Sequence, residues 1–241
     1  MRPTLPTLPS RPLLLLWDID GTLLQRASGE HATALRRAAA RVHGLDALDH
    51  RLGQVAGQTD GAIARDLLQA AGVPAEEIAA RAAEVQVATE AAYAELCPAD
   101  LSATVAPGIP ELLSDLAARP DEFRFSLVTG NFEPVARLKL ARAGLGHWFA
   151  PGQGAFGSDD DSRAALPPIA RARAGDWPRE RTVVIGDTPR DIACARADLL
   201  PVVAVGTGPY GVEALADADA VVDDAHALGP VLEDMAARVG A

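Results

Sequence analysis

Three short polar clusters carry the residue types that could do chemistry, and each cluster follows an apolar run. The clusters are Asp18-Ile19-Asp20-Gly21-Thr22, Thr129-Gly130-Asn131 and Gly186-Asp187-Thr188-Pro189-Arg190-Asp191. In an extended chain, alternation would place Asp18 and Asp20 on the same side of the backbone. Two carboxylates that close repel each other, and a hard divalent cation such as Mg²⁺ would relieve the repulsion. We therefore expect a metal ion at this pair, with a phosphoryl group bound to the metal.

The elements that must position these clusters are strands that alternate with helices. The pattern predicts strands over residues 13–17, 124–130, 182–187, 201–206 and 220–223, with a further short strand at 154–157. Such alternation is typical of a mostly parallel sheet covered by helices on both faces. Ligands of these sheets bind at the carboxyl ends of the strands, so the three clusters should converge on one edge.

A block of about seventy residues between the first two strands is purely helical in pattern. It predicts helices over 31–44 and 60–72 and one long helix over 74–96. The block is too large for an ordinary connection, so we expect an inserted helical cap. The chain then divides into a flexible N-terminal tail (1–12), an α/β core (13–25 and 105–241) and the cap (26–104), with hinges near 23–25 and 106–108.

Composition limits the partners. The chain has 241 residues and a formal net charge of −11, which disfavours nucleic acid or an anionic membrane surface as a partner. No apolar stretch approaches the length of a membrane span. Cys97 and Cys194 have no paired spacing, so we expect reduced thiols in a cytoplasmic protein, with Cys194 as a small buried side chain. A small molecule is the expected partner, and the chain could be a monomer or a homodimer.

The motifs DIDGTL, TGN and GDTPRD resemble the first, second and fourth motifs of the haloacid dehalogenase superfamily. The helical block resembles the cap that this superfamily inserts after its first motif, and VAPGIPELL resembles the return linker of its phosphoglycolate-phosphatase-like branch. The resemblance covers nearly the whole chain from Leu13 onward. It implies a Rossmann-like fold and a Mg²⁺-dependent phosphomonoester hydrolase that acts on a small phosphorylated metabolite through an aspartyl-phosphate.

The resemblance also implies roles for individual residues. Asp18 would be the nucleophile, and Asp20 the general acid and then the general base. The metal ligands would be Asp18, the main-chain carbonyl of Asp20, Asp187 and Asp191. The phosphate oxygens would be held by Thr22, Thr129, Gly130 and Asn131.

The third motif of the family needs a basic residue, and two residues could supply it. Arg163 opens the helix predicted before the 182–187 strand. Lys139 lies eight residues beyond Asn131, roughly 12 Å along a helix, and its side chain leans back toward the helix N-terminus. We favour Arg163 because it needs no such reach. Without a catalytic role, Arg163 would pair with Asp159, Asp160 or Asp161, and Lys139 would be a solvated helix position.

The segment GQTDGAI (57–63) is the expected specificity segment of the cap, through Gly57, Thr59 and Asp60, although Thr59 could equally be an ordinary helix cap. His31, His43 and His50 have no metal-ligand spacing, and we expect them at the surface.

Four alternatives to a phosphatase must be weighed against the same residues. Asp20 argues against a dehalogenase, which lacks the second aspartate of the first motif. The cap has no lysine, which argues against a phosphonatase and weakens a sugar-phosphate mutase. A non-catalytic module that binds a phosphorylated metabolite on the same scaffold is the remaining alternative, but it would have no need of Asp20.

Overall fold

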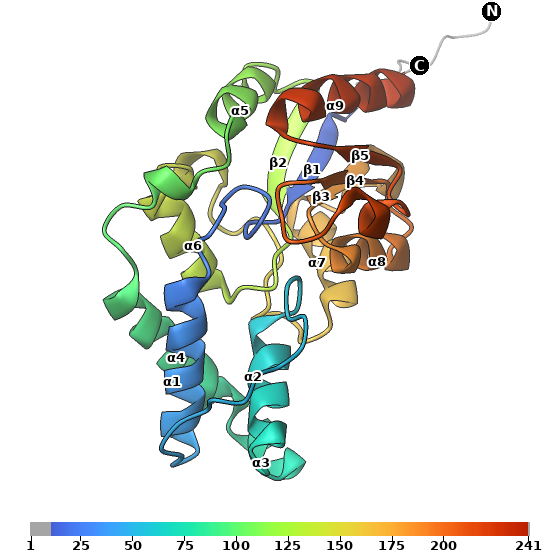
Figure 1. Cartoon of the computed structure of the whole chain (residues 1–241). Coiled ribbons are helices and arrows are strands. Elements are labelled where there is room, and N and C mark those ends of the chain that lie inside the picture. Colours follow the sequence, from blue (N-terminus) through green and yellow to red (C-terminus); the bar gives the residue numbers. More distant parts are fainter. Residues whose placement is uncertain (1–10, 241) are drawn as a thin grey trace, which may run out of the picture.

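The computed structural model describes residues 11–240, and its core is a five-stranded parallel sheet (Figure 1). The strands are β1 (Leu13–Trp17), β2 (Phe123–Leu127), β3 (Thr182–Gly186), β4 (Val202–Val205) and β5 (Ala220–Val222), in the spatial order β2-β1-β3-β4-β5. The α/β fold class predicted from the sequence is confirmed. Residues 1–10 of the expected N-terminal tail lie outside the described residues.

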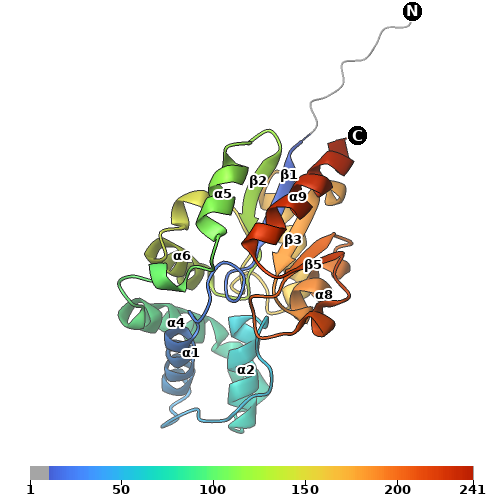
Figure 2. The same cartoon turned by 45° about the horizontal axis from the view of Figure 1, so that its top comes forward.

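Strand β1 is buried on both faces, which explains its continuous apolar sequence. Leu13, Leu15 and Trp17 belong to one hydrophobic cluster, and Leu14 and Leu16 belong to another. The first cluster includes side chains of α5 (Ile109–Ala117), α6 (Glu133–Arg142) and α9 (Ala225–Gly240). The second includes side chains of α7 (Leu166–Arg173) and α8 (Pro189–Ala197). Helices therefore cover both faces of the sheet (Figure 2).

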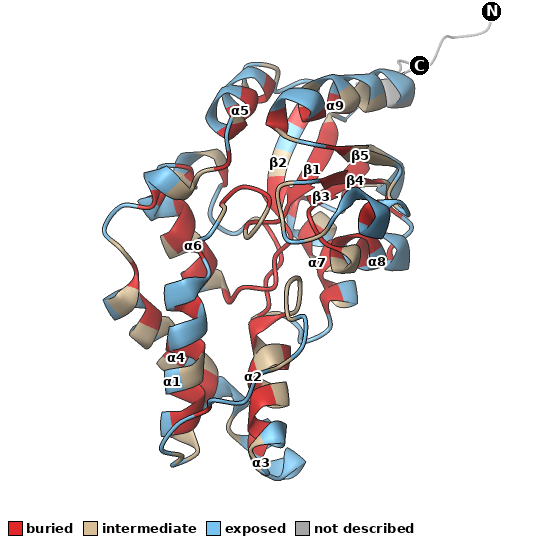
Figure 3. Ribbon diagram, viewed as in Figure 1, coloured by how far each residue is buried: buried red, intermediate tan, exposed pale blue. Residues whose placement is uncertain are grey.

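The predicted helical block forms four helices beyond the carboxyl ends of the strands (Figure 1). They are α1 (Gly29–Val42), α2 (Asp60–Ala70), α3 (Ala75–Ala80) and α4 (Ala82–Leu96). Their buried residues face one another and the core, and their outer faces are exposed (Figure 3). Gly44 and Gly72 follow α1 and α2 with positive φ angles of 66° and 83°, as helix-ending glycines commonly do.

Two local predictions are wrong. The single helix expected over 74–96 is broken at Arg81, where the backbone leaves the helical range (φ −110°, ψ 9°) and the side chain pairs with Glu84. No glycine or proline marks this break in the sequence. The strand expected at 154–157 is only an isolated bridge between Ala155 and Val128, because Gly154 takes a left-handed φ of 101°.

The prediction that Cys194 is a small buried side chain is confirmed. Burial raises the pKa of its thiol to about 12, as suits an unreactive side chain. Trp17, the last residue of β1, is also buried. Within residues 11–240, the helices are all too short or too polar to cross a membrane.

Candidate active site

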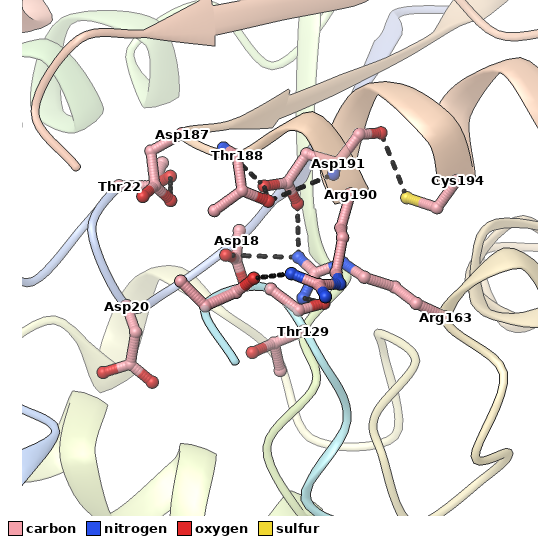
Figure 4. A network of polar contacts seen from close by, with 12 residues as sticks. Asp18, Asp20, Thr22, Thr129, Arg163, Asp187, Thr188, Arg190, Asp191 and Cys194 are labelled. Atoms are coloured by element: carbon pink, nitrogen blue, oxygen red, sulfur yellow. Dashed lines mark hydrogen bonds and ion pairs between the residues drawn. The ribbon is translucent and has the colours of Figure 1, made fainter. Parts of the chain in front are cut away.

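The carboxyl ends of β1, β2 and β3 bring three polar clusters to one edge of the sheet, because these strands are neighbours. Asp18 directly follows β1, and its main-chain N–H donates to the carbonyl of Ile185 in β3 at 2.9 Å. Carboxylate oxygens of Asp18, Asp187 and Asp191 all lie within 4.8 Å of one another, and all three residues are buried (Figure 4). The fourth-motif cluster and the first-motif cluster therefore meet around one point.

Burial and mutual repulsion raise the pKa values of two of these carboxyls. Burial raises the pKa of Asp18 to about 7, although the nearby guanidinium of Arg163 acts in the opposite direction. Burial, followed by the charges of Asp191 and Asp18, raises the pKa of Asp187 to about 9. Both shifts show that the protein alone does not neutralise the negative charge at this edge.

The side chain of Asp187 has the surroundings expected of a metal ligand. Its Oδ1 accepts a hydrogen bond from Thr22 Oγ1 at 3.1 Å, whereas its Oδ2 is buried without a hydrogen-bond partner. A Cβ atom added to Gly21 or Gly208 would lie 2.1 or 1.8 Å from that Oδ2. The two glycines keep side chains away from an unsatisfied carboxylate oxygen, so the residues fit a hard cation such as Mg²⁺, which prefers oxygen ligands.

Asp191 has two functions in this cluster. Its Oδ2 accepts hydrogen bonds from the main-chain N–H and the hydroxyl of Thr188, which closes a capping box at the start of α8. Its Oδ1 accepts a hydrogen bond from Arg163. Asp191 therefore fixes the helix N-terminus beside Asp187 and offers at most one oxygen to a metal ion.

Arg163 links Asp18 to the fourth-motif cluster and to the helical block. Its Nη2 lies 3.2 Å from Asp18 Oδ2 and also contacts Asp191, and its Nη1 donates to the carbonyl of Gly57 at 3.0 Å. The alternative pairings expected for Arg163 are not formed, because Asp159 pairs with Arg173 and Asp161 with Arg65. Of the two candidates for the third-motif base, Arg163 is the one beside Asp18.

Lys139 is fully buried, so the expectation of a solvated helix position is wrong. It lies on α6, and α4 of the helical block packs against that helix. Its Nζ lies 2.6 Å from Asp20 Oδ2 and 3.1 Å from His31 Nδ1. The reach back toward the N-terminus of α6 is therefore made, but its target is Asp20 and not Asp18.

His31 extends this contact into the helical block, and the expectation that it lies at the surface is wrong. Its Nε2 lies 3.0 Å from Asp60 Oδ2, and the same Asp60 oxygen accepts the main-chain N–H of Phe132 at 2.7 Å. The same expectation is wrong for His43, because its side chain is shielded from solvent and contacts Glu77. His50 is exposed, as expected.

The side chain of Asp20 points away from the carboxylate cluster (Figure 4). Its Oδ2 lies within hydrogen-bond distance of Lys139 Nζ. Its oxygens also accept hydrogen bonds from Asn131 Nδ2 at 2.9 Å and Ser28 Oγ at 3.3 Å. Burial favours a higher pKa for Asp20, but the charges of Lys139 and His31 outweigh burial and lower the pKa. Only the main-chain carbonyl of Asp20, and not its carboxylate, is left as a metal ligand.

A cavity of about 160 Å³ lies between the sheet edge and the helical block. Asp18, Arg163, Thr129, Gly130 and Asn131 line one end of it, and Gly57 and Asp60 of the expected specificity segment also line it. Thr59 instead caps α2, where its hydroxyl accepts the N–H of Ala62. Thr22, expected at the phosphate, bonds to Asp187 and does not line the cavity.

The family model that matches the sequence is that of the haloacid dehalogenase-like hydrolases, and it covers residues 15–196. The chain belongs to this family. A search of curated proteins found no match. The family resemblance drawn from the three sequence motifs is thereby confirmed.

Solved structures of the haloacid dehalogenase-like fold are similar to this chain over almost its whole length. β-Phosphoglucomutase from Clostridium difficile is 18% identical with a TM-score of 0.68, covering 94% of this chain and 98% of that chain. A predicted phosphatase from Clostridium acetobutylicum is 17% identical with a TM-score of 0.67 (93% and 100% covered). CbbY from Rhodobacter sphaeroides, in complex with phosphate, is 19% identical with a TM-score of 0.65 (90% and 96% covered). At these identities the comparison establishes the shared fold.

The haloacid dehalogenase-like motifs account for the carboxylate cluster but not for the chain of contacts from Lys139 through His31 to Asp60. The burial of Lys139 is the main feature that sequence analysis missed. One available signal was that it is the only lysine in the chain, whereas arginine supplies nearly every other basic position.

Proposed function

We propose that this haloacid dehalogenase-like hydrolase is a Mg²⁺-dependent phosphomonoester hydrolase that acts on a small phosphorylated metabolite. The observation that carries the proposal is the buried cluster of Asp18, Asp187 and Asp191 next to a cavity, with Asp18 as the member of the cluster that lines it. A buried carboxylate beside a cationic Arg163 is suited to attack on an electrophile in that cavity.

Asp18 is the proposed nucleophile. One carboxylate oxygen forms a bond to phosphorus while the bond from phosphorus to the alcohol oxygen breaks, which leaves an aspartyl-phosphate and the alcohol. Arg163 positions the Asp18 carboxylate for this step. Its guanidinium contacts Asp18, Asp191 and the main-chain carbonyl of Gly57 at the same time. This contact fixes the carboxylate orientation, and positioning supplies much of the rate in phosphoryl transfer.

Asp187, Asp18 and one oxygen of Asp191 would hold the metal ion, with the main-chain carbonyl of Asp20. When bound, Mg²⁺ would neutralise the carboxylate cluster and the charge of the phosphoryl oxygens. Thr22 keeps Asp187 oriented through its hydrogen bond to Oδ1, so that the unsatisfied Oδ2 is the oxygen left for the metal.

Asp20 is the proposed acid and base. In the first step it gives a proton to the departing alcohol oxygen, and in the second it takes a proton from the water that attacks the aspartyl-phosphate, which releases inorganic phosphate and restores Asp18. The low pKa caused by Lys139 favours the ionised form that the second step requires. Protonation for the first step requires the contact with Lys139 to weaken.

The loop Thr129-Gly130-Asn131 is the proposed site of the phosphate oxygens. It follows β2 after Val128, it lines the same end of the cavity as Asp18, and Thr129 is buried there. Asn131 also donates to Asp20, so the same loop connects the phosphate position to the acid and base.

We further propose that residues 26–104 act as a cap that closes over the core. Hydrogen bonds hold the two parts together: Arg190 donates to the carbonyls of Ala56 and Gln54, and the N–H of Asp60 donates to Gly130 at 2.8 Å. The two expected hinges lie side by side, since Ala106 N–H donates to Leu23 at 2.9 Å and Gln25 N–H to Thr104 at 2.6 Å. Closure of this kind excludes water from the reacting groups.

Release of phosphate from an aryl phosphate tests the function. We expect turnover with Mg²⁺, none after EDTA, and a loss of at least about a thousandfold in Asp18→Asn, because a covalent step is removed. Asp223→Asn, which changes an exposed aspartate after β5, is the matched control and should retain activity. Full activity of Asp18→Asn would exclude Asp18 as nucleophile. Binding of inorganic phosphate without turnover of any ester would favour the non-catalytic module.

A further inference from the structure

Much of the cavity lining away from Asp18 and Arg163 is aliphatic. Its far wall consists of aliphatic side chains of α1, of α2 and of the loop between them: Ala32, Leu35, Leu52, Val55, Ile63 and Leu67. Leu35 and Leu67 are buried, whereas Leu52, Val55 and Ile63 are only partly buried and face the cavity. A ligand that covers these three side chains would gain their apolar surface.

The polar side chains on the same wall already bond to other parts of the protein. Both ring nitrogens of His31 have partners, Lys139 and Asp60. The Nη1 of Arg36 donates to the carbonyls of Leu48 and His50 and so holds the loop that carries Val55. Gln58 is the exception, because it also lines the cavity and its buried Oε1 has no hydrogen-bond partner within the described residues. The wall therefore offers at most one side-chain amide to a hydroxyl group of a ligand.

The size of the cavity limits the ligand as well. Its volume of about 160 Å³ is close to that of an apolar protein cavity of about 150 Å³ that binds benzene. The end beside Asp18, Thr129 and Gly130 must also hold the phosphoryl group. The space that remains fits a few carbon atoms and is too small for a hexose or a nucleoside.

We propose that the substrate is the phosphate monoester of a short, largely apolar alcohol, and that Leu52, Val55 and Ile63 select it. The proposal rests on the phosphatase function proposed above. A hydroxyl buried against this wall without a partner weakens binding by about tenfold. A second anionic group on this wall would meet the carboxylate of Asp60, and the Nη1 of Arg36, the cationic side chain of the same wall, donates to two carbonyls.

A matched pair of substrates provides the first test: n-propyl phosphate and glycerol 3-phosphate share a carbon chain and differ by two hydroxyls. With Mg²⁺, we expect KM for glycerol 3-phosphate to be higher by about tenfold, because Gln58 can meet at most one of the two hydroxyls and the other is buried without a partner. Glucose 6-phosphate and phosphoglycolate should be turned over no better than glycerol 3-phosphate. A lower KM for any of these three than for n-propyl phosphate would overturn the proposal.

Variants of the wall provide the second test. Val55→Thr replaces an apolar contact with a hydroxyl at little change in size, and Ile63→Thr does so with the loss of one further carbon. Each should raise KM for n-propyl phosphate by roughly three- to tenfold with kcat almost unchanged. Val87→Thr makes the same type of change on α4, where the side chain is 65% exposed, and should leave KM unchanged. Unaltered KM in both wall variants, with thermal unfolding as in the wild type, would contradict the role of the wall.

Measurements of ligand binding distinguish an error in the proposed substrate class from an error in the proposed phosphatase function. If no ester releases phosphate, the phosphatase function is wrong, and thermal stabilisation by phosphonates in Mg²⁺ then tests the cavity alone. If n-butylphosphonate raises Tm at a concentration at least tenfold lower than 3,4-dihydroxybutylphosphonate needs for the same rise, the cavity prefers an apolar ligand and the proposal stands. Equal or stronger stabilisation by the dihydroxy compound would overturn it.

Discussion

The Nζ atom of Lys139 lies 2.6 Å from the Oδ2 atom of Asp20, although the two residues are 119 positions apart. The lysine side chain has no exposed surface, so its charge acts on Asp20 with little screening by water. His31 and Asp60 continue the contact into the cap. The protonation state of the proposed acid and base is therefore coupled to residues of three separate segments.

Replacing Lys139 should change both activity and stability. In Lys139→Met the charge that lowers the pKa of Asp20 is lost while burial remains, so the acid limb of the pH profile of kcat/KM should move to higher pH. Breaking a buried pair should also lower the free energy of unfolding by roughly 3 kcal/mol, measured in urea. Arg142→Met, an exposed position on the same helix, is the control. An unmoved acid limb would show that Lys139 has no influence on Asp20.

The pKa values of Asp18 and Asp187 predict how the metal-free protein responds to pH. Both carboxyls titrate higher in the folded protein, at about 7 and about 9, than their ordinary value of 3.8. The folded state binds these protons more tightly than the unfolded state does. The contribution of the two groups to the free energy of unfolding is therefore complete below pH 4 and is lost as pH rises toward 9. The loss is at most about 1.4 kcal/mol per pH unit for each group.

Thermal unfolding between pH 5.5 and 9 measures this effect. In EDTA, Tm of the wild type should fall with pH more steeply than Tm of Asp187→Asn, which lacks one of the two groups. Mg²⁺ must displace protons from the site, so its stabilising effect should grow with pH in the wild type and be absent in the variant. Parallel Tm curves for the two proteins in EDTA would contradict the raised pKa of Asp187.

The sequence predicted those features that depend on local pattern. Continuous apolar runs identified the buried strands, and the polar residues that end β1, β2 and β3 identified the site, because the carboxyl ends of parallel strands meet at one edge. The burial of Lys139 and His31 was not predicted. It depends on α4 of the helical block packing against α6 and on α1 packing against α4, and residue type and spacing alone do not reveal which surface a distant helix covers.

Arg163 should not be replaceable by lysine. Its guanidinium contacts Asp18, Asp191 and the carbonyl of Gly57 together, and a single ammonium cannot span three partners in this geometry. We expect Arg163→Lys to lower kcat by about a hundredfold, because the variant loses a group that positions the reacting carboxylate. Arg37→Lys, an exposed position on α1, should retain activity. A kcat within threefold of the wild type in Arg163→Lys would exclude this positioning role.

Gly130 is the point at which the core approaches the helical block most closely. A Cβ atom at this position would lie 2.1 Å from the main-chain carbonyl oxygen of Gln58, and backbone cannot move aside as a flexible side chain can. Gly130→Ala should therefore separate Gln58 from the loop, weaken the hydrogen bond from Asp60 N–H to Gly130, and leave the proposed cap open over the site. We expect kcat/KM to fall at least about tenfold, since closure completes the pocket and excludes water.

The matched control for this glycine is Gly211→Ala, because an added Cβ there meets no atom within 4 Å and the φ of −74° suits any residue. Limited proteolysis gives a readout that is independent of activity. Residues 23–25 and 106–108 should be cleaved faster in Gly130→Ala than in Gly211→Ala, while far-UV circular dichroism stays the same for both. Equal cleavage rates together with full activity in Gly130→Ala would show that contact between Gly130 and Gln58 is not required for closure.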